Sequence, residues 1–99
     1  MSVLIIVENT SENLSWINDY LSQVPSIVSA YGGHYITRTN TVELLEGNEC
    51  PQTTVVAQFP SKEAALSFYH SNEYQPFKDA RLTHSTSKMM LVAIENGAE

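Results

Sequence analysis

Two short apolar runs, one near each end of the chain, constrain the fold more than any other feature. Val3–Val7 and Lys88–Glu95 contain apolar stretches that do not alternate with polar residues. A run of this length, rich in β-branched residues and bounded by polar ones, predicts a strand that is covered on both faces of its sheet. The fold must therefore place apolar surface on each side of a sheet that contains both segments.

The segment that follows the first run predicts a helix. Asn9 and Glu12, three residues apart, resemble an N-terminal capping pair. Pro25 lacks the amide that would bond to the carbonyl of Leu21, so we expect a kink, or a break into two helices, near Val24. The apolar stripe on one face of this helix consists of Leu14, Ile17, Leu21, Val24 and Val28.

Residues 31–47 predict a helix end, a strand, a turn and a second strand. Gly32-Gly33 can adopt the left-handed backbone that closes a helix. Tyr35-Ile36-Thr37 has the β-branched and aromatic character of a strand, and Asn40 can form the turn.

The second half of the chain predicts a strand, a helix and the final strand. Thr53–Phe59 is the strand, and Pro60 ends it. Ser61 is placed as the N-cap of a second helix with an aromatic face. Ser71–Tyr74 starts a short further helix, which Pro76 is expected to make irregular.

This order of elements predicts a ferredoxin-like β-α-β-β-α-β fold of the α+β class, with a four-stranded antiparallel sheet and two main helices on one face. Residues 1–96 form the single domain and residues 97–99 a short tail. Two helices cover only one face of such a sheet. The other face must meet another apolar surface, and a second copy of the chain is the expected supplier, so we expect a homodimer through the sheet.

Charge and composition argue against several kinds of partner. The chain has 5 Lys and Arg against 11 Asp and Glu, a net charge of −6, which disfavours nucleic acid. Val3–Val7 is too short to cross a membrane or to act as a signal peptide. Cys50 stands alone, so it forms no internal disulfide, which is consistent with a cytoplasmic location.

The histidines predict no metal site. His34, His70 and His84 have neither the short spacing nor the neighbouring cysteines of a metal centre. Cys50 lacks a context that would activate its thiol, and no phosphate-binding loop or serine elbow is present. We therefore expect no metal and no organic cofactor.

Arg38, Glu46 and Arg81 form the main candidate constellation. An arginine fork can hold the carboxylate of a ligand or that of a neighbouring side chain, so an internal ion pair with Glu46 and a ligand-anchoring role both remain open. His34 lies four residues before Arg38. The two-residue period of a strand would place both on one face, where His34 could act as an acid or base.

Further candidates lie around the end of the second predicted helix. Tyr69, Ser71 and Tyr74 could line a pocket with their hydroxyl groups or could serve only in capping and core packing. Trp16 and Tyr20 are four residues apart on the first helix, and we expect them to pack on each other or on the sheet.

An ordered set of short motifs runs over nearly the whole chain. It consists of Gly32-Gly33-His34-Tyr35, Arg38, residues 42–47, Pro51, Phe59-Pro60-Ser61, Glu63-Ala64-Ala65, Phe68-Tyr69, Ser71, Glu73-Tyr74-Gln75 and Arg81. Together these motifs resemble the domain of unknown function 1330 family, although the chain departs from the family pattern at Thr39-Asn40 and Asn48-Glu49.

The resemblance implies a ferredoxin-like subunit of the dimeric α/β-barrel superfamily, in which two sheets pack face to face, and it implies no activity. The superfamily includes cofactor-independent monooxygenases, isomerases, haem-handling enzymes and ligand-binding proteins.

Two functions are compatible with these features. The first is a small-molecule-binding or non-catalytic dimeric module. The second is a cofactor-independent enzyme, monooxygenase-like or isomerase-like, that acts on a small anionic or aromatic metabolite in the subunit cavity.

Overall fold

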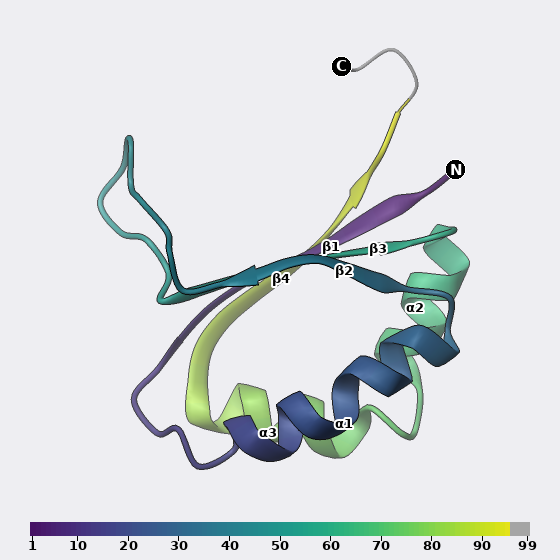
Figure 1. Ribbon diagram of the computed structural model, residues 1–99, viewed down its shortest axis with the longest axis horizontal. Coiled ribbons are helices and arrows are strands. Elements are labelled where there is room, and N and C mark those ends of the chain that lie inside the picture. The colour runs from purple at the N-terminus through teal and green to yellow at the C-terminus, as the bar shows by residue number, and fades with distance from the viewer. Residues whose placement is uncertain (96–99) are drawn as a thin grey trace.

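The computed structural model describes residues 1–95, which form a four-stranded antiparallel sheet with helices on one face (Figure 1). The strand order is β2-β3-β1-β4, which confirms the ferredoxin-like fold. The tail predicted at residues 97–99 lies outside the described residues. The elements in chain order are β1 (Val3–Ser11), α1 (Ile17–Ala30), β2 (His34–Thr39), β3 (Thr53–Phe59), α2 (Lys62–His70), α3 (Gln75–His84) and β4 (Ser85–Ala93).

The central strand β1 separates two environments. Val3, Ile5 and Val7 face the helices and are buried. Leu4 and Ile6 point to the opposite face, where they are only partly buried. The core therefore lies between the sheet and the helices, and the other face of the sheet is open in the single chain. The remaining buried hydrophobic residues are Val24, Val28, Ala57, Phe59, Ala65, Phe68 and Tyr74.

The capping pair predicted at Asn9 and Glu12 is wrong. Asn9 lies in β1, opposite Thr53 of β3 and Ser87 of β4. Partners on both sides extend the strand, and α1 begins only at Ile17, without a side-chain hydrogen bond at its N-cap. The sheet thus takes up residues that the capping pattern had assigned to a helix.

We expected a kink, or a break into two helices, near Val24, and the break into two helices does not occur. The helix α1 continues from Ile17 to Ala30 with Pro25 inside it. Val24 and Val28, on either side of the proline, are both buried in the core. Packing of these two residues holds the helix together, although proline removes one of its hydrogen bonds.

The second strand predicted within residues 31–47 is absent from the described residues. Residues 40–52, which we call the arm, contain no helix or strand. The arm projects beyond the sheet on the side away from the helices (Figure 1). The reason is that β3 occupies the place beside β2 that a hairpin partner would take. Leu45 on the arm is 85% exposed.

The segment after Ser71 forms a regular helix, contrary to our expectation. Pro76 stands in the first turn of α3, at a position where a helix has no use for the missing amide. The helix then runs to His84 and leads directly into β4. The fold is therefore β-α-β-β-α-α-β, and three helices cover the sheet within the described part of the chain.

Candidate functional site

A cavity of about 840 Å³ lies between the helix-facing side of the sheet and helices α1 and α3. Its size is typical of sites for small organic molecules. Most of its wall is apolar and includes Val7, Val24 and Met89. Five of its polar residues matter for the chemistry, namely Tyr20, Tyr35, Arg38, Tyr74 and Arg81.

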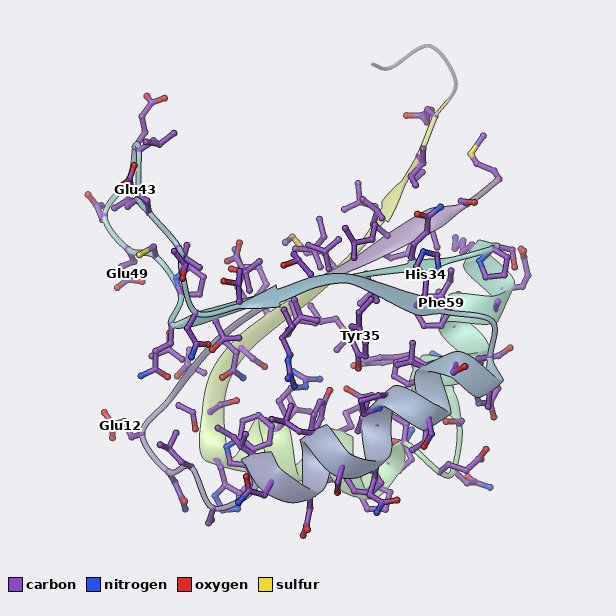
Figure 2. All side chains as sticks on the ribbon, viewed as in Figure 1. Glu12, His34, Tyr35, Glu43, Glu49 and Phe59 are labelled. Carbon is purple, nitrogen blue, oxygen red and sulfur yellow. The ribbon has the colours of Figure 1, made fainter. Side chains whose placement is uncertain are left out.

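The register of β2 decides which of its side chains reach the cavity. Tyr35 pairs with Ala57 and Arg38 pairs with Val55, two residues apart on β3, and the register shifts between Tyr35 and Thr37. This irregularity places Tyr35 and Arg38 on the cavity side although they are three residues apart. In Figure 2, Tyr35 points into the space between the sheet and the helices.

The predicted juxtaposition of His34 and Arg38 is therefore wrong. His34 precedes the irregularity, is exposed and does not line the cavity, whereas Arg38 follows it and does. The two-residue period holds only while the ladder is regular, and one extra residue reverses the faces beyond it. His34 therefore lies outside this cavity, on the other side of the strand.

Arg81 is the most deeply buried charged residue of the site, with 3% of its surface exposed. Its Nη1 donates a hydrogen bond to Ser87 Oγ, while its Nε has no partner among the described residues. Tyr74 precedes Arg81 by seven residues, or about two helical turns, so both side chains lie on one side of α3.

The internal ion pair that we considered for the arginines is not formed. Within residues 1–95 the one salt bridge joins Lys88 Nζ to Glu8 Oε1 at 3.9 Å. Glu46 lies on the arm, is exposed and does not line the cavity. Figure 2 shows Glu43 and Glu49 on the same arm, away from the space under the sheet. No described carboxylate neutralises Arg38 or Arg81.

Two phenol groups are joined inside the site. The hydroxyl oxygens of Tyr20 and Tyr74 are 2.7 Å apart, and Tyr74 has no exposed surface. Burial raises the pKa of Tyr20 well above its ordinary value, and neighbouring Tyr74 adds to this effect. Burial also raises the pKa of Tyr35 to about 12, against the opposing influence of Arg38. The phenols of Tyr20 and Tyr35 therefore stay protonated at neutral pH and can donate hydrogen bonds.

A polar network fixes the end of α3 that carries Arg81. Asn9 Nδ2 donates to Ser85 Oγ at 2.9 Å, and Ser85 Oγ donates to the carbonyl oxygen of Arg81. Beside it, Trp16 Nε1 donates to Ser11 Oγ at 3.0 Å. Side chains from β1 and β4 thus hold the backbone carbonyl of Arg81 in place.

Ser71 and Tyr69 lie outside the cavity lining. Ser71 Oγ donates to the carbonyl oxygen of Phe68 at 2.8 Å and accepts from the amide of Tyr74 at 3.3 Å. It therefore caps the joint between α2 and α3. The ring of Tyr69 lies under Lys78 Nζ, 4.6 Å from its centroid. Of the predicted candidates, only Arg38, Tyr74 and Arg81 line the cavity.

Two important lining residues, Tyr20 and Tyr35, were missed by the sequence analysis. Tyr20 had a visible signal, since Trp16 lies four residues before it, and their rings do pack edge to face at 5.3 Å between centroids. Tyr35 was treated only as a strand former. The irregularity in β2, which brings it beside Arg38, has no signature in the sequence.

The described residues contain no group of three His, Cys, Asp or Glu side chains that could hold a metal ion. Cys50 is exposed on the arm. Within residues 1–95, no helix has both the length and the apolar character needed to cross a membrane.

Comparison with known proteins gives one family and several structures. The sequence pattern of the family described as a domain of unknown function (DUF1330) matches residues 2–95. No curated protein sequence matches the chain.

Three solved structures share the fold. RPA0582, a protein of unknown function from Rhodopseudomonas palustris, has a TM-score of 0.75 and 12% identity, over 95% of this chain and 83% of its own. SnoaB, a cofactor-independent oxygenase from Streptomyces nogalater, has a TM-score of 0.66 and 16% identity, over 99% and 98%. Rv0793 from Mycobacterium tuberculosis has a TM-score of 0.59 and 12% identity over the full length of both chains. At these identities the likeness concerns the fold alone.

Proposed function

The chain belongs to the domain of unknown function family DUF1330, whose description names no activity, and from the site itself we propose that the protein is a homodimeric binder of small organic anions. Each subunit would hold one molecule in the cavity between its sheet and helices α1 and α3.

The charge of the cavity lining carries this proposal. Arg38 and Arg81 line the cavity, and the described lining contains no aspartate or glutamate. Arginine stays charged in proteins, and a buried charge without a counter-charge is unfavourable. An anionic ligand would supply the missing negative charge.

The rest of the lining supports an organic ligand over an inorganic ion. Val24, Val28 and Phe68 contribute apolar surface, and the phenols of Tyr20 and Tyr35 offer neutral hydrogen-bond donors. A cavity of about 840 Å³ exceeds the needs of a small inorganic anion. The expected ligand therefore combines an apolar or aromatic body with a negative group.

The open face of the sheet supports the homodimer. Leu4, Ile6, Val56 and Met90 share this face and are only partly buried, although the first three lie on the central strands β1 and β3. A second copy seated on this face would cover them. Light scattering after size exclusion should give twice the mass of the chain, and a stable monomer at micromolar concentration would refute the dimer.

We also propose that the protein is cytoplasmic. Cys50 is exposed and free, and a single free thiol suits a reducing compartment. Fractionation of the native host, with an antibody against the protein, tests this placement, and recovery in a secreted fraction would refute it.

The enzymatic alternative receives less support from the site. Within the described residues the cavity lining has no histidine, cysteine, lysine or carboxylate, and burial raises the pKa of Tyr35 to about 12. A general base works best with a pKa near the operating pH. The lining is thus better suited to holding an anion than to moving protons at neutral pH.

A thermal-shift screen tests the proposed function. The panel contains carboxylates, sulfonates and phosphate esters on apolar bodies, each with a neutral analogue of the same shape. We expect saturable increases in Tm with anions only, because a ligand that binds the folded state stabilises it. Arg38→Met and Arg81→Met should reduce these increases. If neutral analogues raise Tm equally, or no anion does so, the proposal is wrong.

A further inference from the structure

The geometry around Arg81 points to a carboxylic acid as the ligand, with its carboxylate against the Nε side of Arg81 and its apolar body along Val7 and Met89. This inference rests on the proposed function and narrows it to one class of anion and one anchoring residue.

The hydrogen bonding of Arg81 indicates which side of its fork is available. Nη1 is engaged by Ser87 Oγ, whereas Nε lacks a partner among the described residues. A guanidinium group offers two parallel donors along this side, and a planar carboxylate matches them with its two oxygens. Arg81 lines the cavity, but its Nε is itself buried, so the head group contacts this side from inside the cavity once the guanidinium turns toward it.

The charges around Arg81 favour a ligand whose head group carries a single negative charge. Arg81 is buried, whereas the other lining cation, Arg38, is exposed on β2. Arg81 also lies in the last turn of α3, where backbone carbonyls make the local potential negative. A monoanion is neutralised by Arg81 alone, whereas a dianionic phosphate would retain an uncompensated charge in this environment.

The residues around Arg81 determine the chemical character that we expect of the ligand beyond its carboxylate. Ser87 pairs with Asn9 across the sheet, and the next residues on the same face are Met89 and Val7, which also pair with each other. Beyond the carboxylate the cavity wall is therefore apolar, and Tyr74 lies about two turns from Arg81 along α3. A short polar acid would leave this wall uncovered, so we expect an aromatic or branched aliphatic acid.

The test varies the head group on a constant body. Calorimetry with the wild-type protein compares naphthalene-2-carboxylate with the corresponding sulfonate, phosphonate and primary amide, and the benzene series repeats the comparison with a smaller ring. We expect the carboxylate to bind about 10-fold or more tightly than the other anions, and the amide to show no binding.

Each outcome of this series has a distinct meaning. A sulfonate or phosphonate that binds as tightly as the carboxylate overturns the carboxylate assignment and leaves anion binding intact. An amide that binds as tightly overturns both the assignment and the proposed function. Absence of binding by all members of both series overturns the carboxylate assignment, while the broader anion screen still decides the proposed function.

Arg81→Lys tests the contribution of the planar guanidinium donors separately from that of the positive charge. Lysine keeps the positive charge but offers no planar pair of donors, so the preference for carboxylate over sulfonate should shrink by about 10-fold. Lys62→Met is the matched control, because Lys62 is exposed at the start of α2 and does not line the cavity. An unchanged preference in Arg81→Lys would overturn the side-on arrangement.

A measurement on the wild-type protein covers the case in which the Arg81 variants fail to fold. In a ¹H–¹⁵N spectrum of the arginine side chains, the Nε–H signal of the buried arginine should shift on saturation with the carboxylate and remain in place with the amide. Arg38→Met identifies the other signal. A carboxylate that binds without moving the Nε–H signal of Arg81 would refute the contact.

Discussion

Arg81 is a buried cation whose nearest fixed partner is a neutral hydroxyl, that of Ser87. In the empty protein this arrangement costs free energy, because a carboxylate is not available within the described chain to offset the lost hydration. The residue is therefore explained better by what it can bind than by what it contributes to folding.

Arg81→Met should raise the free energy of unfolding of the empty protein by about 1 to 4 kcal/mol, because it replaces an uncompensated charge by an apolar chain of similar length. Urea unfolding measures the change, with Lys62→Met as the exposed control. A loss of stability of similar size would instead assign Arg81 a structural role.

Removing either hydroxyl group of the Tyr20–Tyr74 pair should lower the free energy of unfolding, but by different amounts. Tyr20→Phe leaves the fully buried hydroxyl of Tyr74 without a partner and should cost about 1 to 3 kcal/mol. Tyr74→Phe should cost less, since Tyr20 is only partly buried and can turn to water in the cavity. The double variant should recover part of the loss, because neither hydroxyl remains unpaired. Equal costs that add in the double variant would show that the hydrogen bond is unimportant.

The raised pKa of Tyr35 predicts how the free energy of unfolding changes at alkaline pH. Its pKa is raised from 10.0 to about 12 by burial, so the unfolded chain releases this proton at a lower pH than the folded protein does. Between these values the folded state holds more protons, and the free energy of unfolding must fall as pH rises. Tyr35→Phe should weaken that fall in urea titrations. The difference in absorbance at 295 nm between the wild type and Tyr35→Phe follows the ionisation of Tyr35, and ionisation near the ordinary pKa of 10.0 would contradict the prediction.

At the scale of elements, the sequence predicted those strands and helices whose patterns are local. Thr53–Phe59 has the bounds expected for β3, and Ser61 caps α2 through a 3.0 Å hydrogen bond from the amide of Ala64. The failures concern choices made by tertiary pairing. Asn9 joined the sheet because β3 and β4 were available on both sides, and no local propensity reports that.

The sequence predicted that Arg38 and Arg81 belong to the candidate site, but it did not predict which side chains lie beside them. Arg38 stood out as a cation within an uncharged strand, and it does line the cavity. Its neighbours there depend on the register shift in β2 between Tyr35 and Thr37. A strand with such an irregularity has the same local composition as a regular strand. Only the three-dimensional structure shows that Tyr35, and not His34, lies on the same side of β2 as Arg38.

The helix α1 offers a test of how packing overrides propensity. Pro25→Ala restores the amide that can bond to the carbonyl of Leu21, and it should raise the free energy of unfolding by about 1 to 3 kcal/mol. Ser26→Ala at the exposed neighbouring position controls for the helix propensity of alanine. Urea unfolding compares the two variants. An unchanged or lower stability in Pro25→Ala would mean that proline fits this helix better than alanine does.

At the scale of the whole molecule, neighbouring residues of β1 separate assembly from folding. Ile6→Glu places a charge on the open face and should convert the proposed dimer into a folded monomer. Ile5→Glu places the charge in the core, where Ile5 is 6% exposed, and should unfold the chain. Light scattering and circular dichroism distinguish these outcomes, with exposed Ser22→Glu on α1 as the control. If Ile6→Glu leaves the mass unchanged, the proposed interface is wrong.

The sheet is a single layer with the helices on one side and the open face on the other (Figure 1), and the cavity lies on the helix side. Along β1, Ile5 and Val7 line the cavity, while Leu4 and Ile6 point the other way. With the proposed ligand on one face and the proposed partner on the other, two selective pressures would act on alternate codons of one short gene segment. Relatives of this protein could change their ligand and keep their partner by substitutions at the odd-numbered positions of β1 alone. Substitutions at the even-numbered positions alone could change the partner and keep the ligand. Only an insertion or deletion within the strand would exchange the roles of the two sets of positions.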